Sequence, residues 1–481
     1  MKKPKKFDAN IIVIGAGSGG LISAYIAAAI KAKVILIEKH QMGGDCLNTG
    51  CVPSKALIKT AKFLSDVKNS KKYGVKTASA DFDFSDVMNR VHSIIKKIEP
   101  HDSVERYTSL GVDCIKGEAK IVNRWTVEVN GQTLTAKNII IATGASPFVP
   151  PIDGIKEVDV LTSHNLWDLK EQPKKMVVLG GGPIGAEMAQ AFARLGTEVT
   201  VVEMGPAMLS REDGDVQDYV KEQFEADGIK VMTHTKAVGC FRKDGRQVLK
   251  CESNGQTLEI EFDKLLVAVG RKPNISGFGL ENLEISLRKN KTIETDPFLR
   301  TSVKNIFAVG DVTGPYQFTH TASHQAWYAA VNSLFGPFKK FKVDYSVIPW
   351  ATFTDPEVAR VGLNEKEAAE KGVTVEVTSY GLDDSDRAIA DSSDRGWVKV
   401  LTPPGKDNIL GVTIVGTHAG DLMAEFVLAM KHGLGLKKIL GTIHMYPTLA
   451  ESNKSVAGNW QKNNKPEKVL SWLEKFHRWR R

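Results

Sequence analysis

The chain has 481 residues, of which 42% are hydrophobic and 25% charged, and its net charge is +8. This composition is that of an ordinary globular protein with about three domains, and no apolar run approaches the ~20 residues that a membrane span needs. The basic residues are spread along the chain, which indicates a solvated surface and excludes a dedicated nucleic-acid-binding site. Five cysteines do not make a disulfide scaffold and suit a reducing compartment. No signal peptide is visible, so we expect a cytoplasmic protein.

The first motif is a dinucleotide-binding fingerprint. It consists, in order, of an apolar strand over residues 11–14, the glycines Gly15, Gly17 and Gly20, a small-residue helix over 21–30, a second strand over 34–37, and Glu38. The glycines allow a tight turn and the close approach of a pyrophosphate to the helix N-terminus. The acidic residue at the end of the second strand accepts a hydrogen bond from a ribose hydroxyl. All these parts in the right order predict a dinucleotide site.

Two cysteines, Cys46 and Cys51, follow inside a glycine-rich loop over residues 43–55. Pro53 suits the first turn of a helix that the sequence predicts through residue 64, so Cys51 lies at or just before its N-terminus. Unpaired N–H groups and the helix dipole stabilise a thiolate there. A zinc site would need a second cysteine pair, which the chain lacks, and a structural disulfide would close only a small loop. We therefore expect thiol–disulfide exchange.

The fingerprint occurs a second time. Its parts are a strand over 177–179, the glycines of residues 180–185 including Gly182 and Gly185, a helix through 195, a strand over 199–202, and Glu203. The acid follows the third glycine by 18 residues in both copies. Two dinucleotide sites and a dithiol suggest a relay in which a nicotinamide gives hydride to a flavin and the flavin passes two electrons to a disulfide. We expect the copy beside the cysteines to hold the flavin.

Further strands divide the rest of the chain. A strand over 138–141 runs into a turn, and prolines near residue 150 indicate a domain boundary. Residues 265–273 close the second domain, and the strand before Asp311 is predicted to return to the first, with Asp311 facing the flavin ribityl chain or, alternatively, capping a helix. From about residue 345, short strands and helices alternate as in an α+β domain, which often carries a dimer interface.

The C-terminal tail, residues 466–481, places apolar and aromatic residues at helical spacing among basic ones. Such a helix can lie on a membrane surface, or it can pack on its own protein or on a partner. We expect packing, with weak membrane-surface contact as the alternative, because one short helix binds lipid weakly.

Together these residues resemble the class I flavoprotein disulfide reductases, which include dihydrolipoyl dehydrogenase, glutathione reductase and mercuric reductase. The specific part is Cys46-x4-Cys51 in a GGxCxNxGCxPSK phrase, and the resemblance extends to about residue 460. It implies a homodimer of α/β class, with two Rossmann-like FAD- and NAD(P)-binding domains and a C-terminal α+β dimerisation domain. The implied parts are an FAD domain (1–150), an NAD(P) domain (151–272), a central segment completing the FAD domain (273–344), an interface domain (345–465) and a basic amphipathic C-terminal helix (466–481).

The resemblance also implies roles. Cys46 is the interchange thiol that attacks the substrate, Cys51 is the thiol against the flavin, and Lys55 lies near flavin N5, paired with Glu187. The further FAD contacts are Gly117, Thr143, Gly144 and Asp311, and the nicotinamide-dinucleotide contacts are Gly182, Gly185, Glu203, Ala237 and Gly270. Glu203 favours NADH, because an acid accepts from a free 2′-hydroxyl and repels a 2′-phosphate, although Arg211 is near enough in sequence to keep NADPH open. No resident metal site is expected.

One departure concerns proton transfer. Disulfide-reducing members supply a base from the partner subunit in a His-x-His-Pro-Thr-x-x-Glu phrase, which here runs from His444 to Glu451 with Tyr446 at the working position. A tyrosine with pKa about 10 is only roughly one-thousandth ionised at pH 7, so it is a poor base. It can still donate a proton or a hydrogen bond, or act as an oxygen ligand. Substitution by His444 stays open.

The sequence thus predicts an FAD-dependent NAD(P)H:disulfide oxidoreductase, most like dihydrolipoyl dehydrogenase, that acts on a thiol or disulfide substrate. One alternative is a mercuric-reductase-like metal-ion reductase, although no cysteine lies beyond Cys251 and an N-terminal metal-binding domain is absent. Another is a quinone reductase. A third is a flavin-loaded interaction subunit of a complex, against which the two cysteines, Lys55 and Glu187 argue, because an inactive scaffold needs none of them.

Overall fold

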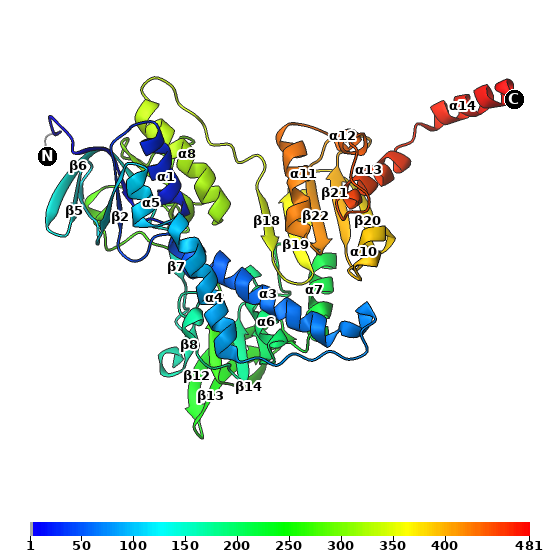
Figure 1. The fold of residues 1–481 in the computed structure, drawn as a ribbon, viewed down its shortest axis with the longest axis horizontal. Helices are drawn as coiled ribbons and strands as arrows, with labels where there is room; N and C mark the ends of the chain where they lie inside the picture. Colours follow the sequence, from blue (N-terminus) through cyan, green and yellow to red (C-terminus); the bar gives the residue numbers. More distant parts are fainter. Residues whose placement is uncertain (1–2) are drawn as a thin grey trace.

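The computed structural model describes residues 3–481 and shows three β-sheet regions surrounded by helices (Figure 1). The first region is built on a seven-stranded sheet with the order β3-β2-β1-β6-β5-β4 and with β17 added beside β6. Its strands are β1 (Ala9–Ile14), β2 (Val34–Glu38), β3 (Val112–Lys116), β4 (Lys120–Asn123), β5 (Thr126–Val129), β6 (Gln132–Ile141) and β17 (Ile306–Ala308). Strands β3, β2, β1, β6 and β17 are parallel, and β4 and β5 form an antiparallel extension.

Burial on both faces explains why β1 is almost wholly apolar. Ile11 and Val13 pack toward helix α1 (Ser18–Ala29), whereas Ile12 and Ile14 face the opposite core, and all four are buried. Helix α8 (Thr319–Phe335) lies beside α1 although some three hundred residues separate them in the chain, as the hydrogen bond from the Ser23 hydroxyl to the Ala326 carbonyl shows (Figure 1). The segment that contains β17 and α8 therefore completes the first region.

The second region holds a five-stranded parallel sheet of order β11-β10-β9-β15-β8. Its strands are β8 (Val160–Leu161), β9 (Lys175–Leu179), β10 (Glu198–Val202), β11 (Lys230–Met232) and β15 (Lys264–Val267), with helices α6 (Pro183–Arg194) and α7 (Gly214–Ala226). An antiparallel sheet of β12 (Thr235–Lys243), β13 (Arg246–Ser253) and β14 (Gln256–Phe262) accompanies it. The chain passes from the first region to the second through β7 (Ala145–Pro147) and returns through β16 (Arg271–Pro273). The two strands pair as an antiparallel ribbon.

Four helices lie in the chain between β2 and β3. They are α2 (Gly44–Asn48), α3 (Cys51–Lys68), α4 (Phe84–Ile98) and α5 (Val104–Ser109). Two of them, α3 and α4, pack against the second region. The apolar faces of α3 and α4 share one core with α6, where the rings of Phe84 and Phe192 lie 6.2 Å apart. Helix α3 begins at Cys51, as the sequence predicts, so the second cysteine stands at the N-terminus of a long helix that is held by the second region.

The third region is an antiparallel five-stranded sheet of order β18-β19-β22-β21-β20. Its strands are β18 (Pro349–Thr352), β19 (Glu357–Gly362), β20 (Glu376–Gly381), β21 (Trp397–Thr402) and β22 (Gly411–Gly416). Its helices are α9 (Glu365–Glu370), α10 (Asp386–Ala390), α11 (Ala419–Lys431), α12 (Leu436–Leu440) and α13 (Glu451–Asn463). The predicted fold class, two Rossmann-like parts followed by an α+β part, is confirmed.

The last helix, α14 (Glu467–Arg480), extends away from the third region (Figure 1). None of its residues is buried, so of the expected packing on its own protein or on a partner, packing on its own chain is wrong, and packing on a partner stays a prediction. No helix within residues 3–481 is long and apolar enough to cross a membrane.

The ion pairs of one buried lysine join the second and third regions. The ammonium of Lys399, on β21, is only 3% exposed and lies 3.1 Å from Asp213, 2.8 Å from Asp215 and 2.7 Å from Glu365. The pKa of Lys399 is raised because, against the cost of burial, its hydrogen bonds to carboxylates favour the charged form. These contacts fix the third region against α7. They thereby also position β18, the strand that leads to Phe353 beside Lys55.

Candidate active site

An elongated groove of about 880 Å³ runs along the carboxyl ends of the first sheet and continues toward α3 and α6. Most residues that the sequence assigns to the flavin and the dithiol line it: Gly15, Gly17, Glu38, Cys46, Cys51, Lys55, Gly117, Thr143, Gly144, Glu187 and Asp311. These residues come from strands, loops and helices that are far apart in the chain. The fold therefore brings the first dinucleotide fingerprint and the two cysteines to one cavity.

The glycines of the first fingerprint are required by close packing. Gly15 has φ +99°, and a Cβ added to Gly20 would lie 1.8 Å from the Gly15 carbonyl oxygen. This contact presses the start of α1 onto the loop after β1, and a Cβ added to Gly17 would lie 3.8 Å from the Cα of Gly44. No side chain caps the N-terminus of α1, so its first N–H groups are available to an anion at the groove. The cradle fits the pyrophosphate of a dinucleotide.

Glu38 is held in place by the backbone around it. One carboxylate oxygen accepts from the Ala16 N–H and the other from the His40 N–H, at 2.6 and 2.7 Å. The second fingerprint repeats this arrangement, because Glu203 accepts from the N–H groups of Gly181 and Gly205 at 2.6 Å each. Both acids are therefore fixed at the ends of their strands, where a ribose would lie.

The two cysteines are free thiols at the junction of two helices, Cys46 within α2 and Cys51 at the first position of α3. The Cys51 sulfur lies 3.4 Å from the Thr319 hydroxyl. A hydrogen bond from Cys46, assisted by Thr319 and by the charge of Lys55, lowers the pKa of Cys51 to about 6. The same hydrogen bond, together with burial, raises the pKa of Cys46. In the reduced pair the thiolate therefore sits on Cys51 and the proton on Cys46.

Lys55 lies one turn along α3 from Cys51, and its ammonium pairs with Glu187 of α6 at 2.7 Å. Glu187 is almost buried and also accepts from the Phe353 N–H at 2.9 Å. The ammonium in turn lies 4.3 Å from the centre of the Phe353 ring. All three sheet regions thus meet at this one cation, which stands beside the dithiol as the sequence predicts for a lysine close to a flavin.

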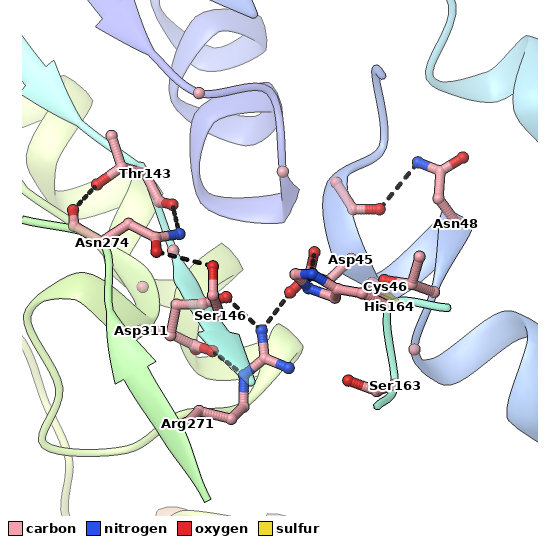
Figure 2. A pocket seen from close by; sticks show the side chains of 18 of the residues that line it. Asp45, Cys46, Asn48, Thr143, Ser146, Ser163, His164, Arg271, Asn274 and Asp311 are labelled. Atoms are coloured by element: carbon pink, nitrogen blue, oxygen red, sulfur yellow. Dashed lines mark hydrogen bonds and ion pairs between the residues drawn. The ribbon is translucent and has the colours of Figure 1, made fainter. Parts of the chain in front are cut away.

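In the charged cluster at the centre of Figure 2, the sequence assigned a role to Asp311 but none to Arg271, Asp45 or His164. The guanidinium of Arg271, on β16, contacts the carboxylate of Asp45 and lies 3.6 Å from Asp311. His164 approaches the other oxygen of Asp45 at 3.5 Å. Although burial opposes it, the hydrogen bond from His164 and the charge of Arg271 lower the pKa of Asp45, whereas burial raises that of Asp311. Asp311 does not cap a helix here, since it lies inside a short 3-10 turn.

The residues assigned to the nicotinamide dinucleotide lie outside the groove. Gly182 and Gly185 are at the start of α6, Glu203 follows β10, Ala237 is on β12 and Gly270 precedes β16. A Cβ on Gly185 would lie 2.0 Å from the Gly180 carbonyl oxygen, which repeats the packing of the first fingerprint. Around Gly182 there is open space, and no side chain caps α6. This second cradle fits another pyrophosphate, with Ile184 and Glu187 facing the groove side.

The segment with the tyrosine departure is on the surface of the third region. Tyr446 is 67% exposed, and its hydroxyl donates to the Asp386 carboxylate at 2.9 Å. His444 points elsewhere: its Nε2 lies 2.9 Å from Glu425 and its Nδ1 lies 3.1 Å from the Thr442 carbonyl oxygen. Both ring nitrogens of His444 are engaged, which leaves it no free position for a substrate. Glu451 accepts from the Thr448 N–H in the turn before α13, and its charge adds to that of Asp386 in raising the pKa of Tyr446.

Two family models match the chain, one over the first and second sheet regions and the other over the third. Residues 9–326 match the family model described as pyridine nucleotide-disulphide oxidoreductase, and residues 348–457 match the dimerisation domain of that family. A mercuric reductase from Staphylococcus aureus is 33% identical over 95% of this chain and 83% of its own length. A dihydrolipoyl dehydrogenase from Geobacillus stearothermophilus is 37% identical over 92% of this chain and 94% of its own length.

A solved structure shares the whole architecture. The Cu(II) complex of the HOCl-induced flavoprotein disulfide reductase RclA from Escherichia coli superposes with a TM-score of 0.82 at 27% identity. The match covers 92% of this chain and 98% of that one. The dimerisation-domain match supports a homodimer, and the family match implies FAD and a nicotinamide dinucleotide as cofactors.

Proposed function

The chain belongs to the pyridine nucleotide-disulphide oxidoreductases and is an FAD-dependent disulfide oxidoreductase, and we propose that it uses NADH to reduce a small disulfide. The resemblance drawn from the sequence is thereby confirmed at the level of the family. The observation that carries the proposal is the thiolate-stabilised pair Cys46 and Cys51, which shares one groove with the first fingerprint and with the Lys55–Glu187 ion pair.

FAD, when bound, supplies the chemistry that takes a hydride from a nicotinamide and passes two electrons to a disulfide. In our proposal Glu38 and the N-terminus of α1 hold its ribose and pyrophosphate, and Asp311 orients the ribityl side. Thr143 and Gly144, in the turn after β6, and Gly117, in the turn after β3, line the remaining wall. Lys55, fixed by Glu187, places a positive charge beside Cys51 and keeps that sulfur ionised.

The dithiol then passes two electrons to the substrate. Moving the shared proton from Cys46 to Cys51 makes Cys46 the thiolate, which attacks one sulfur of the substrate disulfide and releases the other half as a thiol once it is protonated. Cys51, after losing its proton, attacks the mixed disulfide at Cys46, re-forms the Cys46–Cys51 bond and releases the second substrate thiolate. The balance is one NADH, one proton and one disulfide giving NAD⁺ and two thiols.

Tyr446 supports this direction of the reaction. We place it opposite the partner subunit's dithiol, as the dimerisation domain implies, with the neighbouring side chains Ile443 (93% exposed) and Met445 (78% exposed) at the same surface. The hydrogen bond to Asp386 raises the pKa of Tyr446, so its hydroxyl stays protonated and can donate to a leaving thiolate but does not act as a base. We also propose a cytoplasmic location. We further propose that the chain divides into five parts, with boundaries at residues 150, 272, 344 and 465.

The deciding experiment is steady-state turnover of the purified holoenzyme in both directions, with a Tyr446→His variant beside it. Reduction of lipoamide by NADH that is much faster than oxidation of dihydrolipoamide by NAD⁺, with the variant restoring the oxidation, would support the proposal. Rapid dihydrolipoamide oxidation by the native enzyme would contradict the assigned direction, because it would mean that a base is present.

A soft metal ion is the second candidate substrate. It is favoured by Tyr446, an oxygen ligand in place of a base, and by the names of two relatives, a mercuric reductase and a reductase solved as a Cu(II) complex. A reduced thiol pair suits such ions. NADH oxidation dependent on Hg²⁺ or Cu²⁺, lost in Cys46→Ser and greater than that with any disulfide tested, would favour this candidate over the first.

A further inference from the structure

Helix α14 is an amphipathic element that no part of residues 3–481 covers. It lies beyond residue 457, where the match to the dimerisation domain ends, and it extends from the body of the molecule (Figure 1). Trp472 is 63% exposed and Trp479 is 81% exposed. An isolated helix of this length is only marginally stable in water, and its stability normally comes from covering its apolar face. The helix therefore needs a surface to lie against.

The aromatic residues of α14 form one continuous stripe. The Trp472 and Phe476 rings stack at 5.7 Å, and the Phe476 and Trp479 rings lie 6.3 Å apart. At 3.6 residues per turn, Val469 and Leu473 fall within the same stripe. These side chains lie on one face because they are three or four positions apart.

The charges of α14 are sorted around that stripe. Both acids, Glu467 and Glu474, fall on the side opposite Phe476, where Glu474 pairs with Arg478 at 2.6 Å. Lys468 and Lys475 fall along the edge beside Trp479, whereas Arg480 falls between Val469 and Leu473, with its guanidinium 5.7 Å from the centre of the Phe476 ring. An apolar stripe with basic side chains along one edge and an arginine within it, and with the acids on the far side, is the pattern of a helix that lies in the plane of an anionic membrane surface.

We propose that α14 docks the enzyme on a bilayer that contains anionic phospholipid. The helix is too short to span, since fourteen residues rise about 21 Å, so it lies at the interface, where tryptophan is favoured. A second dimer is a poorer occupant, because each of its chains carries a net charge of +8 and would repel the basic edge of the helix. The homodimer presents two such helices, and their linkage strengthens the binding that one short helix gives weakly.

The test is co-sedimentation of the full-length, FAD-loaded protein with vesicles of phosphatidylcholine alone or with phosphatidylglycerol added. We expect binding to the anionic vesicles, little binding to phosphatidylcholine, and weakening by salt. Trp472→Ser with Trp479→Ser should weaken partitioning by at least about tenfold, because two large apolar side chains no longer enter the interface. Lys468→Glu with Lys475→Glu should have a similar effect.

The matched control is Phe338→Ser, which removes an equally exposed aromatic side chain (90%) outside α14 and should leave binding unchanged. Equal binding to both vesicle types, or no binding to either, would overturn the proposal. So would a native protein that forms an assembly larger than the dimer and returns to the dimer in the double tryptophan variant, since α14 would then cover a second copy. None of these readouts depends on the substrate proposed above.

Discussion

The hydroxyl of Tyr446 donates to the carboxylate of Asp386 at 2.9 Å, across 60 residues of the chain. Asp386 begins α10, and the following residue, Arg387, reaches the Pro447 carbonyl oxygen at 3.5 Å, so two contacts fix this loop to the helix. The pair is a tyrosine and a carboxylate where the sequence resemblance leads one to look for an imidazole. In the single chain the proton of the tyrosine hydroxyl points to this carboxylate.

Replacing Asp386 by asparagine should lower the pKa of Tyr446 toward its ordinary value, because the hydrogen bond and the negative charge that disfavour the phenolate are weakened. Ultraviolet difference titration of Asp386→Asn and native protein, each against its Tyr446→Phe counterpart, isolates this one tyrosine. The alkaline fall in disulfide-reduction rate should move to lower pH with it. Asp384→Asn, another exposed carboxylate of the same segment, should move neither, and an unchanged Tyr446 titration in Asp386→Asn would contradict the assigned contact.

The reduced dithiol should react with iodoacetamide along a pH profile with a midpoint of about 6, set by Cys51. Below that midpoint the thiolate is protonated and alkylation slows; above it the rate levels off. Lys55→Met should move the midpoint upward, because a positive charge that stabilises the thiolate is lost, whereas Lys59→Met, one turn further along α3 and exposed, should not. A midpoint near the ordinary thiol value in the native protein would show that Cys51 is not stabilised.

Lys399→Met should destabilise the holoenzyme by about 3–5 kcal/mol, because it leaves the buried Asp213 carboxylate without its cation and also removes the cation of the half-exposed Asp215 and Glu365. Adding Glu365→Gln should recover part of the loss, since one unpaired charge is removed. Chemical denaturation followed by flavin and tryptophan fluorescence measures both, and Lys371→Met, exposed at the end of α9, is the control. A loss no larger than that of the control would mean that these ion pairs do not hold the second and third regions together.

The parts of the fold that the sequence predicts are those whose signals are local. The strands around Ile11 and Val177, the turn at Gly15 and the helix start at Cys51 each follow from adjacent residues, and the structure has them at these places. Arg271 illustrates what could not be predicted. Its contact with Asp45 spans 226 residues and depends on the ribbon of β7 and β16, which no local pattern reveals.

The surface of the third region shows the same limit. That Tyr446 replaces a histidine is visible in the sequence, but its partner Asp386 is not, because the turn before α13 and the start of α10 meet only in the folded sheet. The opposite orientations of His444 and Tyr446 were equally hidden: an extended segment would put both on one face, whereas the chain between Gly441 and Ala450 turns instead. The exposure of α14 likewise required knowing what the rest of the chain leaves uncovered.

Glu203 should make the enzyme prefer NADH over NADPH in kcat/KM, because its carboxylate is already fixed by two backbone N–H groups and cannot turn away from a 2′-phosphate. Glu203→Gln keeps a hydrogen-bonding group of the same shape but removes the charge, so the NADH preference should fall by about tenfold, chiefly through the KM for NADPH. Arg211 is exposed and its carbonyl is bound by Asn364, which places it on the α7 side of the loop, so Arg211→Ala should leave the ratio unchanged. A native enzyme that prefers NADPH and loses that preference in Arg211→Ala would assign the 2′-phosphate to Arg211 and overturn the role given to Glu203.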